Sequence, residues 1–231
     1  MTQRDQAYNA IRRAILKGEV PIGETLSERK FTETHLPDED LGRTPIREAL
    51  AVLALRGLVR QLPQVGFDVP PVTASEATRI VQIRNAMERV VVEQLPTSLT
   101  ESGIGGTVDR MKRAAKDEDP FEFVTATRDF HIEICVQADY RAEAQSVGAF
   151  YDRLQLFFLT ERKPLRFHEM ETLAGLYEQL IGSLFVHDVY GALRLFDKTA
   201  KEEIQMIEVR EQPEERAAAI AAARAGAVTA A

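Results

Sequence analysis

Two arginines flank a threonine and a proline in the segment GRTPIREAL, residues 42–50. Thr44 is a residue type that caps helix N-termini, and Pro45 suits the first helical position, where its missing N–H costs nothing. The free N–H groups and the positive dipole end of such a helix attract phosphate. Arg43 and Arg47 lie one helical turn apart, and a forked guanidinium fits phosphate oxygens or the guanine edge in the major groove. The spacing therefore predicts a helix whose N-terminal edge contacts DNA.

Two further residues extend this predicted edge. Arg29 lies at the start of the preceding predicted helix and would reach the DNA backbone, and Gly66 would let the tip of a hairpin approach a minor groove closely. Each arginine taken alone would be interpreted as a solvated surface charge. The ordered combination of capped helix, flanking arginines and glycine-tipped hairpin favours contact with DNA.

The charge distribution permits a nucleic-acid partner without requiring one. The chain has a net charge of −7, and an acidic run, Asp38-Glu39-Asp40, directly precedes the predicted helix. Residues 1–70 nevertheless hold ten basic and ten acidic side chains, so the acidic excess lies beyond residue 70. A neutral domain binds DNA if its basic residues share one face. The acidic run either points into solvent or holds Arg43 or Arg47 until DNA displaces it.

The N-terminal part of the chain must position these side chains. Hydrophobic periodicity and turn residues predict helices at residues 8–16, 28–34 and 45–56 and strands at residues 58–59 and 67–69. Ser27 is the predicted cap of the second helix, and residues 63–66 are the predicted hairpin tip. Three short helices followed by a hairpin predict a winged helix-turn-helix domain over residues 1–70.

The rest of the chain is helical in period. Residues 71–74 form a predicted linker, and Thr73 with Glu76 forms a predicted capping box. The expected helices cover residues 75–95, 104–115, 120–138, 142–161, 168–186 and 189–209. The fold class is therefore mainly α, with an all-α helical bundle over residues 75–211. The alanine-rich tail, residues 212–231, has few large apolar side chains and is expected to be disordered.

Composition excludes several other classes of protein. Of the 231 residues, 45% are apolar and 28% are charged, and no apolar run reaches the ~18 residues of a membrane helix. The N-terminus has no apolar signal region, so we expect a cytoplasmic protein without a membrane partner. The single cysteine, Cys135, excludes an intramolecular disulfide and is expected to be a buried, inert thiol.

Several segments resemble a known family. LKGEVPIGETLSERKF, GRTPIREALAVLALRGLV and QVGF resemble the winged-helix domain of GntR-type bacterial transcription regulators. IRNAMERVVVEQL, DPFEFVTATRDFHIEICVQA and YEQLIGSLFVHDVYGALRLFDKT resemble helices of the FCD effector domain found in the FadR-like subfamily. The resemblance covers both predicted domains.

The resemblance implies a homodimeric transcription regulator, expected to be a repressor, that binds an inverted-repeat operator. Its operator affinity would be controlled by a small-molecule effector, a small organic acid or a related metabolite. The implied DNA contacts are Arg29, Arg43, Thr44, Arg47 and Gly66. This chain departs from the family at two places: the loop containing the acidic run is longer, and Val65 replaces a basic residue before the wing glycine. Both changes should weaken attraction to phosphate.

Many FCD domains hold a divalent metal with one aspartate and three histidines. The corresponding positions in this chain are Thr127, His131, Tyr177 and Thr199. One imidazole and three hydroxyls are poor metal ligands, so we expect no metal and no other cofactor. The same four residues, with Arg84, form the predicted effector pocket. Arg84 matches a family arginine and would pair with an acid or with Glu88, and His131 is equally consistent with a buried histidine bonded to a neighbour.

Two alternative functions stay open. The loss of the metal ligands is consistent with a constitutive repressor that no small molecule controls. A hydrolytic enzyme with His131 as general base is the less favoured alternative, because the sequence contains none of the common nucleophile, P-loop or zinc-protease motifs. We therefore expect a protein that is not an enzyme.

Overall fold

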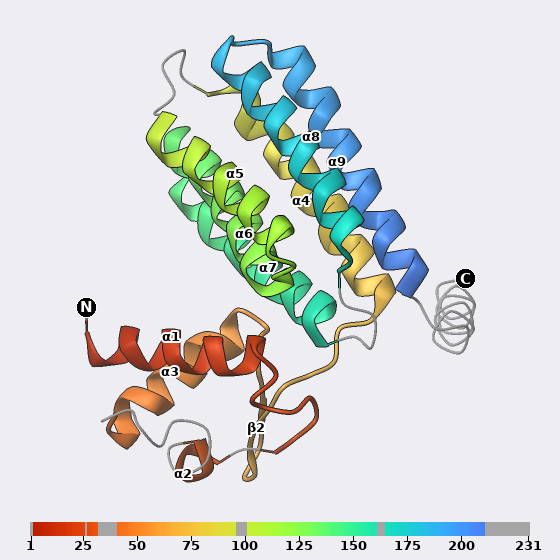
Figure 1. Cartoon of the computed structure of the whole chain (residues 1–231). Coiled ribbons are helices and arrows are strands. Elements are labelled where there is room, and N and C mark those ends of the chain that lie inside the picture. The colour runs from red at the N-terminus through yellow and green to blue at the C-terminus, as the bar shows by residue number, and fades with distance from the viewer. Residues whose placement is uncertain (1, 26, 32–40, 96–100, 161–164, 211–231) are drawn as a thin grey trace, which may run out of the picture. The chain divides into compact units, whose positions relative to one another are not determined.

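The computed structural model describes residues 2–25, 27–31, 41–95, 101–160 and 165–210 (Figure 1). The chain divides into two compact units. Unit 1 comprises residues 1–71 and 151–164, and unit 2 comprises residues 72–150 and 165–231. The acidic run at 38–40 and the tail at 212–231 lie outside the described residues, so the statements about them stay predictions.

Helix α1 (Gln3–Leu16) begins before Tyr8, where the apolar pattern predicted its start. Thr2 and Asp5 form a capping box: Asp5 N donates to Thr2 Oγ1 and Thr2 N donates to Asp5 Oδ2, both at 3.1 Å. Because this first turn is polar, hydrophobic periodicity does not reveal it, and the capping pair determines the start.

Helix α2 (Glu28–Lys30) is capped as predicted, since Ser27 Oγ accepts from Lys30 N at 3.2 Å. The predicted continuation of this helix to residue 34 runs into residues that the structure does not describe. Helix α3 (Arg43–Leu55) packs on α1. The predicted buried stripe of α3 is confirmed at Ile46, Ala49, Leu50 and Leu53. Gly57, with φ +74°, follows the helix end as predicted.

The strands of the hairpin lie at other residues than predicted. Strands β1 (Arg60–Leu62) and β2 (Gly66–Asp68) pair antiparallel, with Leu62 opposite Gly66. The predicted first strand at residues 58–59 is wrong, because Leu58 and Val59 are buried where the chain leaves α3. Gly66 is therefore the first residue of β2 and not the hairpin tip. It still has positive φ (+131°), a conformation that favours glycine.

Unit 2 is helical, as expected. Its helices are α4 (Ala74–Glu93), α5 (Glu101–Lys116), α6 (Pro120–Gln137), the first half of α7 (Arg141–Thr160), α8 (Phe167–Phe185) and α9 (Val189–Arg210). Thr73 caps α4 by accepting from Glu76 N at 3.1 Å. Each helix lies within a few residues of its predicted range, because strong periodicity and capping residues coincide.

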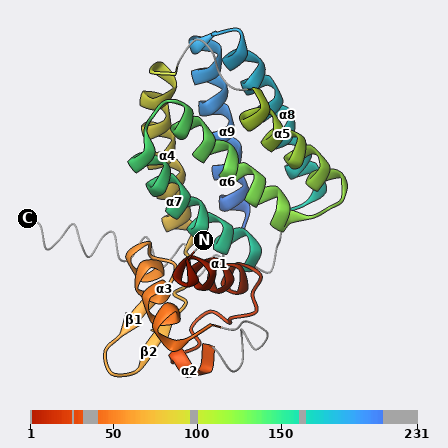
Figure 2. The same ribbon diagram turned by 90° about the vertical axis from the view of Figure 1, so that its left-hand side faces the viewer.

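The helices of unit 2 pack in a closed ring. α4 packs on α9, α9 on α8, α8 on α5, α5 on α6, and α6 again on α4. Figures 1 and 2 show α4, α8 and α9 running beside one another. Side chains that project inward from different helices therefore meet in one core. Among the described helices, none is both long and apolar enough to cross a membrane.

Candidate functional site

The N-terminal edge of α3 carries three of the predicted DNA contacts, Arg43, Thr44 and Arg47, and all three are exposed. The predicted cap is wrong. Gly42 occupies the N-cap position with extended backbone (φ −68°, ψ 160°), the helix begins at Arg43, and within the described residues no side chain caps it. An uncapped helix start leaves its first N–H groups to an external acceptor, and two arginines accompany them at the same end. The edge thus has the chemistry of an anion site.

The other two predicted contacts belong to the same unit. Arg29 is exposed on α2. Gly66 is half-buried in β2, and Val65 before it is 58% exposed at the turn. The turn between β1 and β2 therefore presents an apolar side chain to solvent.

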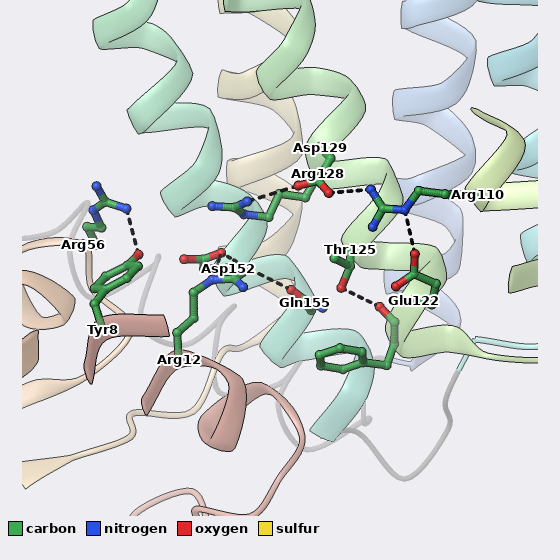
Figure 3. A network of polar contacts seen from close by, with 11 residues as sticks. Tyr8, Arg12, Arg56, Arg110, Glu122, Thr125, Arg128, Asp129, Asp152 and Gln155 are labelled. Carbon is green, nitrogen blue, oxygen red and sulfur yellow. Dashed lines mark hydrogen bonds and ion pairs between the residues drawn. The ribbon is translucent and has the colours of Figure 1, made fainter. Parts of the chain in front are cut away.

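Polar contacts inside unit 1 fix α1. Arg12 Nε and Nη2 donate to Asp152 Oδ1 at 2.9 and 2.6 Å, and Nη2 also donates to Gln155 Oε1 at 3.2 Å (Figure 3). Asp152 is fully buried. Arg56 Nη1 donates to Tyr8 Oη at 2.7 Å, and its guanidinium carbon lies 5.0 Å from the Tyr8 ring centre. No sequence pattern predicted these pairs, since Arg12 and Asp152 are 140 positions apart.

The centre of unit 2 contains a cluster of buried polar side chains from four helices. Arg84 on α4, 1% exposed, donates from Nη2 to Glu203 Oε2 on α9 at 2.5 Å. Its Nη1 lies 3.1 Å from His131 Nε2 on α6, and its Nε lies 3.9 Å from Glu88 Oε2. His131 Nε2 also lies 2.7 Å from Tyr177 Oη on α8. We call Arg84, Glu88, His131, Tyr177 and Glu203 the central cluster.

The partners of His131 determine its tautomer. His131 Nδ1 lies 2.5 Å from Glu88 Oε1, and a carboxylate can only accept, so the proton is on Nδ1. Burial lowers the pKa of His131 and the Arg84 charge lowers it further, while Glu88 opposes both. The imidazole is therefore neutral, and its Nε2 lone pair faces the guanidinium of Arg84 and the hydroxyl of Tyr177.

Tyr177 and Arg84 keep the protonation that they have in water. Burial raises the pKa of the Tyr177 hydroxyl, and the Glu203 carboxylate adds to the effect, so this tyrosine stays neutral. Burial alone would lower the pKa of Arg84, but the carboxylates of Glu203 and Glu88 outweigh it and hold the pKa above its ordinary value. Arg84 is thus a permanent positive charge inside the helical ring.

The structure brings together three of the five predicted effector residues, Arg84, His131 and Tyr177. The other two, Thr127 and Thr199, are buried, but each hydroxyl donates to a carbonyl of its own helix: Thr127 Oγ1 to Phe123 O at 2.9 Å and Thr199 Oγ1 to Phe196 O at 2.8 Å. Each hydroxyl thus uses its proton within its own helix and keeps only oxygen lone pairs for a ligand, so the predicted effector role of these two residues stays a prediction.

Glu203 was not predicted from the sequence. Glu88 was the named candidate partner of Arg84, yet Glu203 makes the shorter contact. Glu203 lies four residues after Thr199, on the same helix face. This spacing signals that Glu203 shares a helix face with Thr199, but it carries no information about Arg84, which lies 119 positions away.

The donors that the resemblance assigns to metal-ligand positions do not fit a divalent metal. One neutral imidazole, one phenol and two threonine hydroxyls supply no anionic ligand, and a guanidinium lies 3.1 Å from the imidazole nitrogen. Among the described residues, no group of three or more His, Cys, Asp or Glu side chains is arranged to hold a metal ion.

A winged helix-turn-helix unit with an exposed basic helix edge, in one chain with an all-helical bundle, defines a class of bacterial transcription regulators. The family model for bacterial regulatory proteins of the gntR family matches residues 3–69, and that for the FCD domain matches residues 79–198. The chain belongs to the GntR family and carries an FCD domain, as the sequence motifs indicated.

Similar proteins agree with this assignment. An uncharacterised HTH-type transcriptional regulator of Streptomyces ambofaciens is 31% identical over 131 residues, 56% of this chain and 54% of the relative. The gluconate operon transcriptional repressor of Bacillus licheniformis is 31% identical over 116 residues, 49% and 46% of the two chains. The chain thus spans about half the length of these curated relatives.

Solved structures show the same fold. A putative GntR regulator from Rhodococcus sp. RHA1 superposes with a TM-score of 0.76 at 19% identity, covering 92% of this chain and 100% of the other. McbR/YncC of E. coli superposes with a TM-score of 0.73 at 19% identity, covering 90% and 98%. At this level of identity the likeness concerns the fold alone.

Proposed function

We propose that this protein is a cytoplasmic transcriptional repressor that binds an inverted-repeat operator as a homodimer. The observation that carries the proposal is the N-terminal edge of α3, where Arg43 and Arg47 are exposed beside an uncapped helix start. Two such edges in a dimer would read two half-sites, with Arg29, Thr44 and Gly66 as further contacts. The name of the Bacillus licheniformis relative supports repression as the outcome.

Substitution of Arg47 tests the proposal. Operator DNA would come from genome-wide mapping of binding sites, and affinity would be measured by fluorescence anisotropy at physiological salt. Arg47→Ala should lower specific affinity about tenfold or more, because it removes a forked contact to a base or phosphate. Arg13→Ala is the matched control, since it removes the same charge from an exposed position on α1. Operator affinity retained by Arg47→Ala would count against the assignment.

The proposed effector response involves unit 2. A small organic acid or related metabolite would bind near Arg84, with His131 and Tyr177 as polar neighbours. Because Glu203 already holds the guanidinium at 2.5 Å, an acid would have to displace this carboxylate. Calorimetric titration with candidate metabolites, followed by operator-affinity measurements with each binder, tests this part of the proposal.

The internal pairing of the central cluster favours a second candidate function. If the polar groups of Arg84, Glu88, His131 and Glu203 only hydrogen-bond and ion-pair with one another and bind no effector, the protein is a constitutive repressor. The two candidates differ in one observable: a metabolite that changes operator affinity supports the effector-controlled repressor, and insensitivity to every binder supports the constitutive one.

A further inference from the structure

The turn between β1 and β2 holds one residue in a backbone conformation that side chains rarely adopt. Val65 N donates to Leu62 O at 3.2 Å, which closes a four-residue turn with Pro63 second and Gln64 third. Gln64 has a φ of +64°. A proline followed by a positive φ is typical of a type II turn, whose third position favours glycine or asparagine. Glutamine is strained there, and strained residues of this kind concentrate at sites that bind a ligand.

The side chains at the tip of this turn are exposed to solvent. Gln64 is exposed, and Val65 beside it is 58% exposed. Figures 1 and 2 both show the turn at the same end of unit 1 as α2, which carries the predicted DNA contact Arg29. The turn therefore offers one amide and one apolar group at the end of the unit where a predicted DNA contact lies.

The hairpin brings no net charge to DNA. Between residues 57 and 70 the charged side chains are Arg60 and Asp68 alone. They lie opposite each other in the hairpin, and Arg60 Nε and Nη2 donate to Asp68 Oδ1 and Oδ2 at 3.1 and 2.5 Å. Because this forked ion pair is neutral as a whole, the hairpin releases few counterions from phosphate. A contact between the hairpin tip and DNA therefore depends on uncharged groups.

An amide beside an apolar side chain suits a minor groove lined by A·T pairs. Adenine N3 and thymine O2 are acceptors in that groove, and the NH2 group of a glutamine can donate to them. A G·C pair adds the 2-amino group of guanine, which is a donor. An apolar side chain that covers this amino group removes it from water without giving it a hydrogen bond, which is unfavourable. The combination therefore favours A·T over G·C pairs.

We propose that Gln64 and Val65 make an uncharged contact with the minor groove and select A·T pairs beneath the hairpin. Gln64 donates from its amide to the groove acceptors, and Val65 disfavours the amino group of guanine. Gly66, with a φ of +131° and no side chain, lets the backbone approach the groove. This inference rests on the proposed binding of unit 1 to DNA and adds the base preference of the hairpin to it.

Base analogues in the operator test the proposal with the unmodified full chain. Each A·T pair of the operator would be replaced in turn by G·C and by inosine·cytosine, which lacks the 2-amino group and so resembles A·T in the minor groove but G·C in the major groove. At one or more positions G·C should lower the affinity roughly fivefold or more, and inosine·cytosine should restore it. If no G·C replacement lowers the affinity, or if inosine·cytosine never restores it, the proposal is wrong.

Variants assign the effect to the hairpin. Gln64→Gly removes the amide and also relieves the strain at a positive φ, so it should raise the melting temperature while it lowers operator affinity roughly fivefold or more. Val65→Ala should reduce the preference for inosine·cytosine over G·C. Gln61→Ala is the matched control, because it removes an exposed amide from β1 of the same hairpin and should leave affinity and preference unchanged. A Gln64→Gly chain that keeps the affinity and preference of the unmodified protein would overturn the proposal.

The salt dependence of binding separates this contact from a contact to phosphate. Gln64→Gly should leave the slope of log affinity against log salt concentration unchanged, whereas Val65→Arg should steepen it by about 0.9. A shallower slope for Gln64→Gly, or an unchanged slope for Val65→Arg, would overturn the proposal. Failure of the proposed function looks different, because Arg47→Ala would then keep its operator affinity. If only the inference about the hairpin fails, the effect of Arg47→Ala remains.

Discussion

Removing one partner of the contact between Arg84 and Glu203 should destabilise unit 2 strongly, through a coupling that disappears when both charges are removed. Arg84→Met leaves two carboxylates buried without their guanidinium, and Glu203→Gln leaves the guanidinium with Glu88 alone, at 3.9 Å. Breaking one side of a buried ion pair costs about 3–5 kcal/mol. For a chain of this size, that corresponds to a fall of roughly 6–20 °C in melting temperature.

The double variant separates charge pairing from packing. Arg84→Met with Glu203→Gln has no unpaired charge from this contact, so its loss should be smaller than the sum of the single losses by about 2 kcal/mol or more. Urea unfolding followed by far-ultraviolet circular dichroism measures the three losses. If they add within about 0.5 kcal/mol, the two side chains act independently and the reasoning is refuted.

A second ion pair between the same helices is a matched control. Arg89 Nη1 on α4 donates to Asp197 Oδ2 on α9 at 2.8 Å, but the two side chains are 40% and 43% exposed. The cycle of Arg89→Met and Asp197→Asn should show a coupling of only about 0.2–1 kcal/mol, since water screens the pair. Equal couplings in the two cycles would mean that burial does not set the strength of the Arg84 contact.

Three further predictions concern other positions. Burial alone would raise the pKa of the Glu169 carboxyl, but hydrogen bonds from Arg210 and from the Arg166 backbone outweigh it and lower this pKa in the folded protein. Glu169 therefore contributes stability above about pH 4.5, and this contribution is lost as the pH falls through the folded pKa. Glu169→Gln should remove this part of the acid dependence, which melting curves recorded over a range of pH would measure. Burial raises the pKa of the Cys135 thiol to about 12, so a thiol-reactive disulfide reagent at pH 8 should modify this cysteine only after unfolding, and rapid labelling of the native chain would contradict its burial. Gly57→Ala should cost about 1–2 kcal/mol in urea unfolding because of the +74° φ, although no atom within 4 Å obstructs the added methyl group, and a neutral effect would show that the turn relaxes.

Local signals predicted most elements of the fold. The apolar stripe of α3, the Ser27 and Thr73 caps and Pro120 at the start of α6 each depend on a few adjacent residues, and each was confirmed. The errors were also local. Gly42 displaced Thr44 as the cap of α3, since a helix start can move by one or two residues at little cost.

The first strand was misplaced for a different reason. Leu58 is aliphatic and Val59 is β-branched, and both types are common in strands. Here the two side chains are buried in the core beside the end of α3 instead. Arg60 and Gln61, which follow them, are the residues that pair with β2, and both are exposed. Apolar and polar residues therefore do not alternate along β1, and the sequence pattern does not reveal this strand. Whether an apolar pair lies in a strand or in the core before it depends on the packing of the helices.

By itself the sequence determined the type and order of the elements and the family. Those features depend on periodicity, caps and motifs, which act over a few residues. Only the tertiary structure decided that Arg84 pairs with Glu203 and faces the imidazole of His131. The physical reason is that the energy of a buried charge depends on which opposite charge the fold brings within hydrogen-bonding distance, and Glu203 lies 119 positions from Arg84 along the chain.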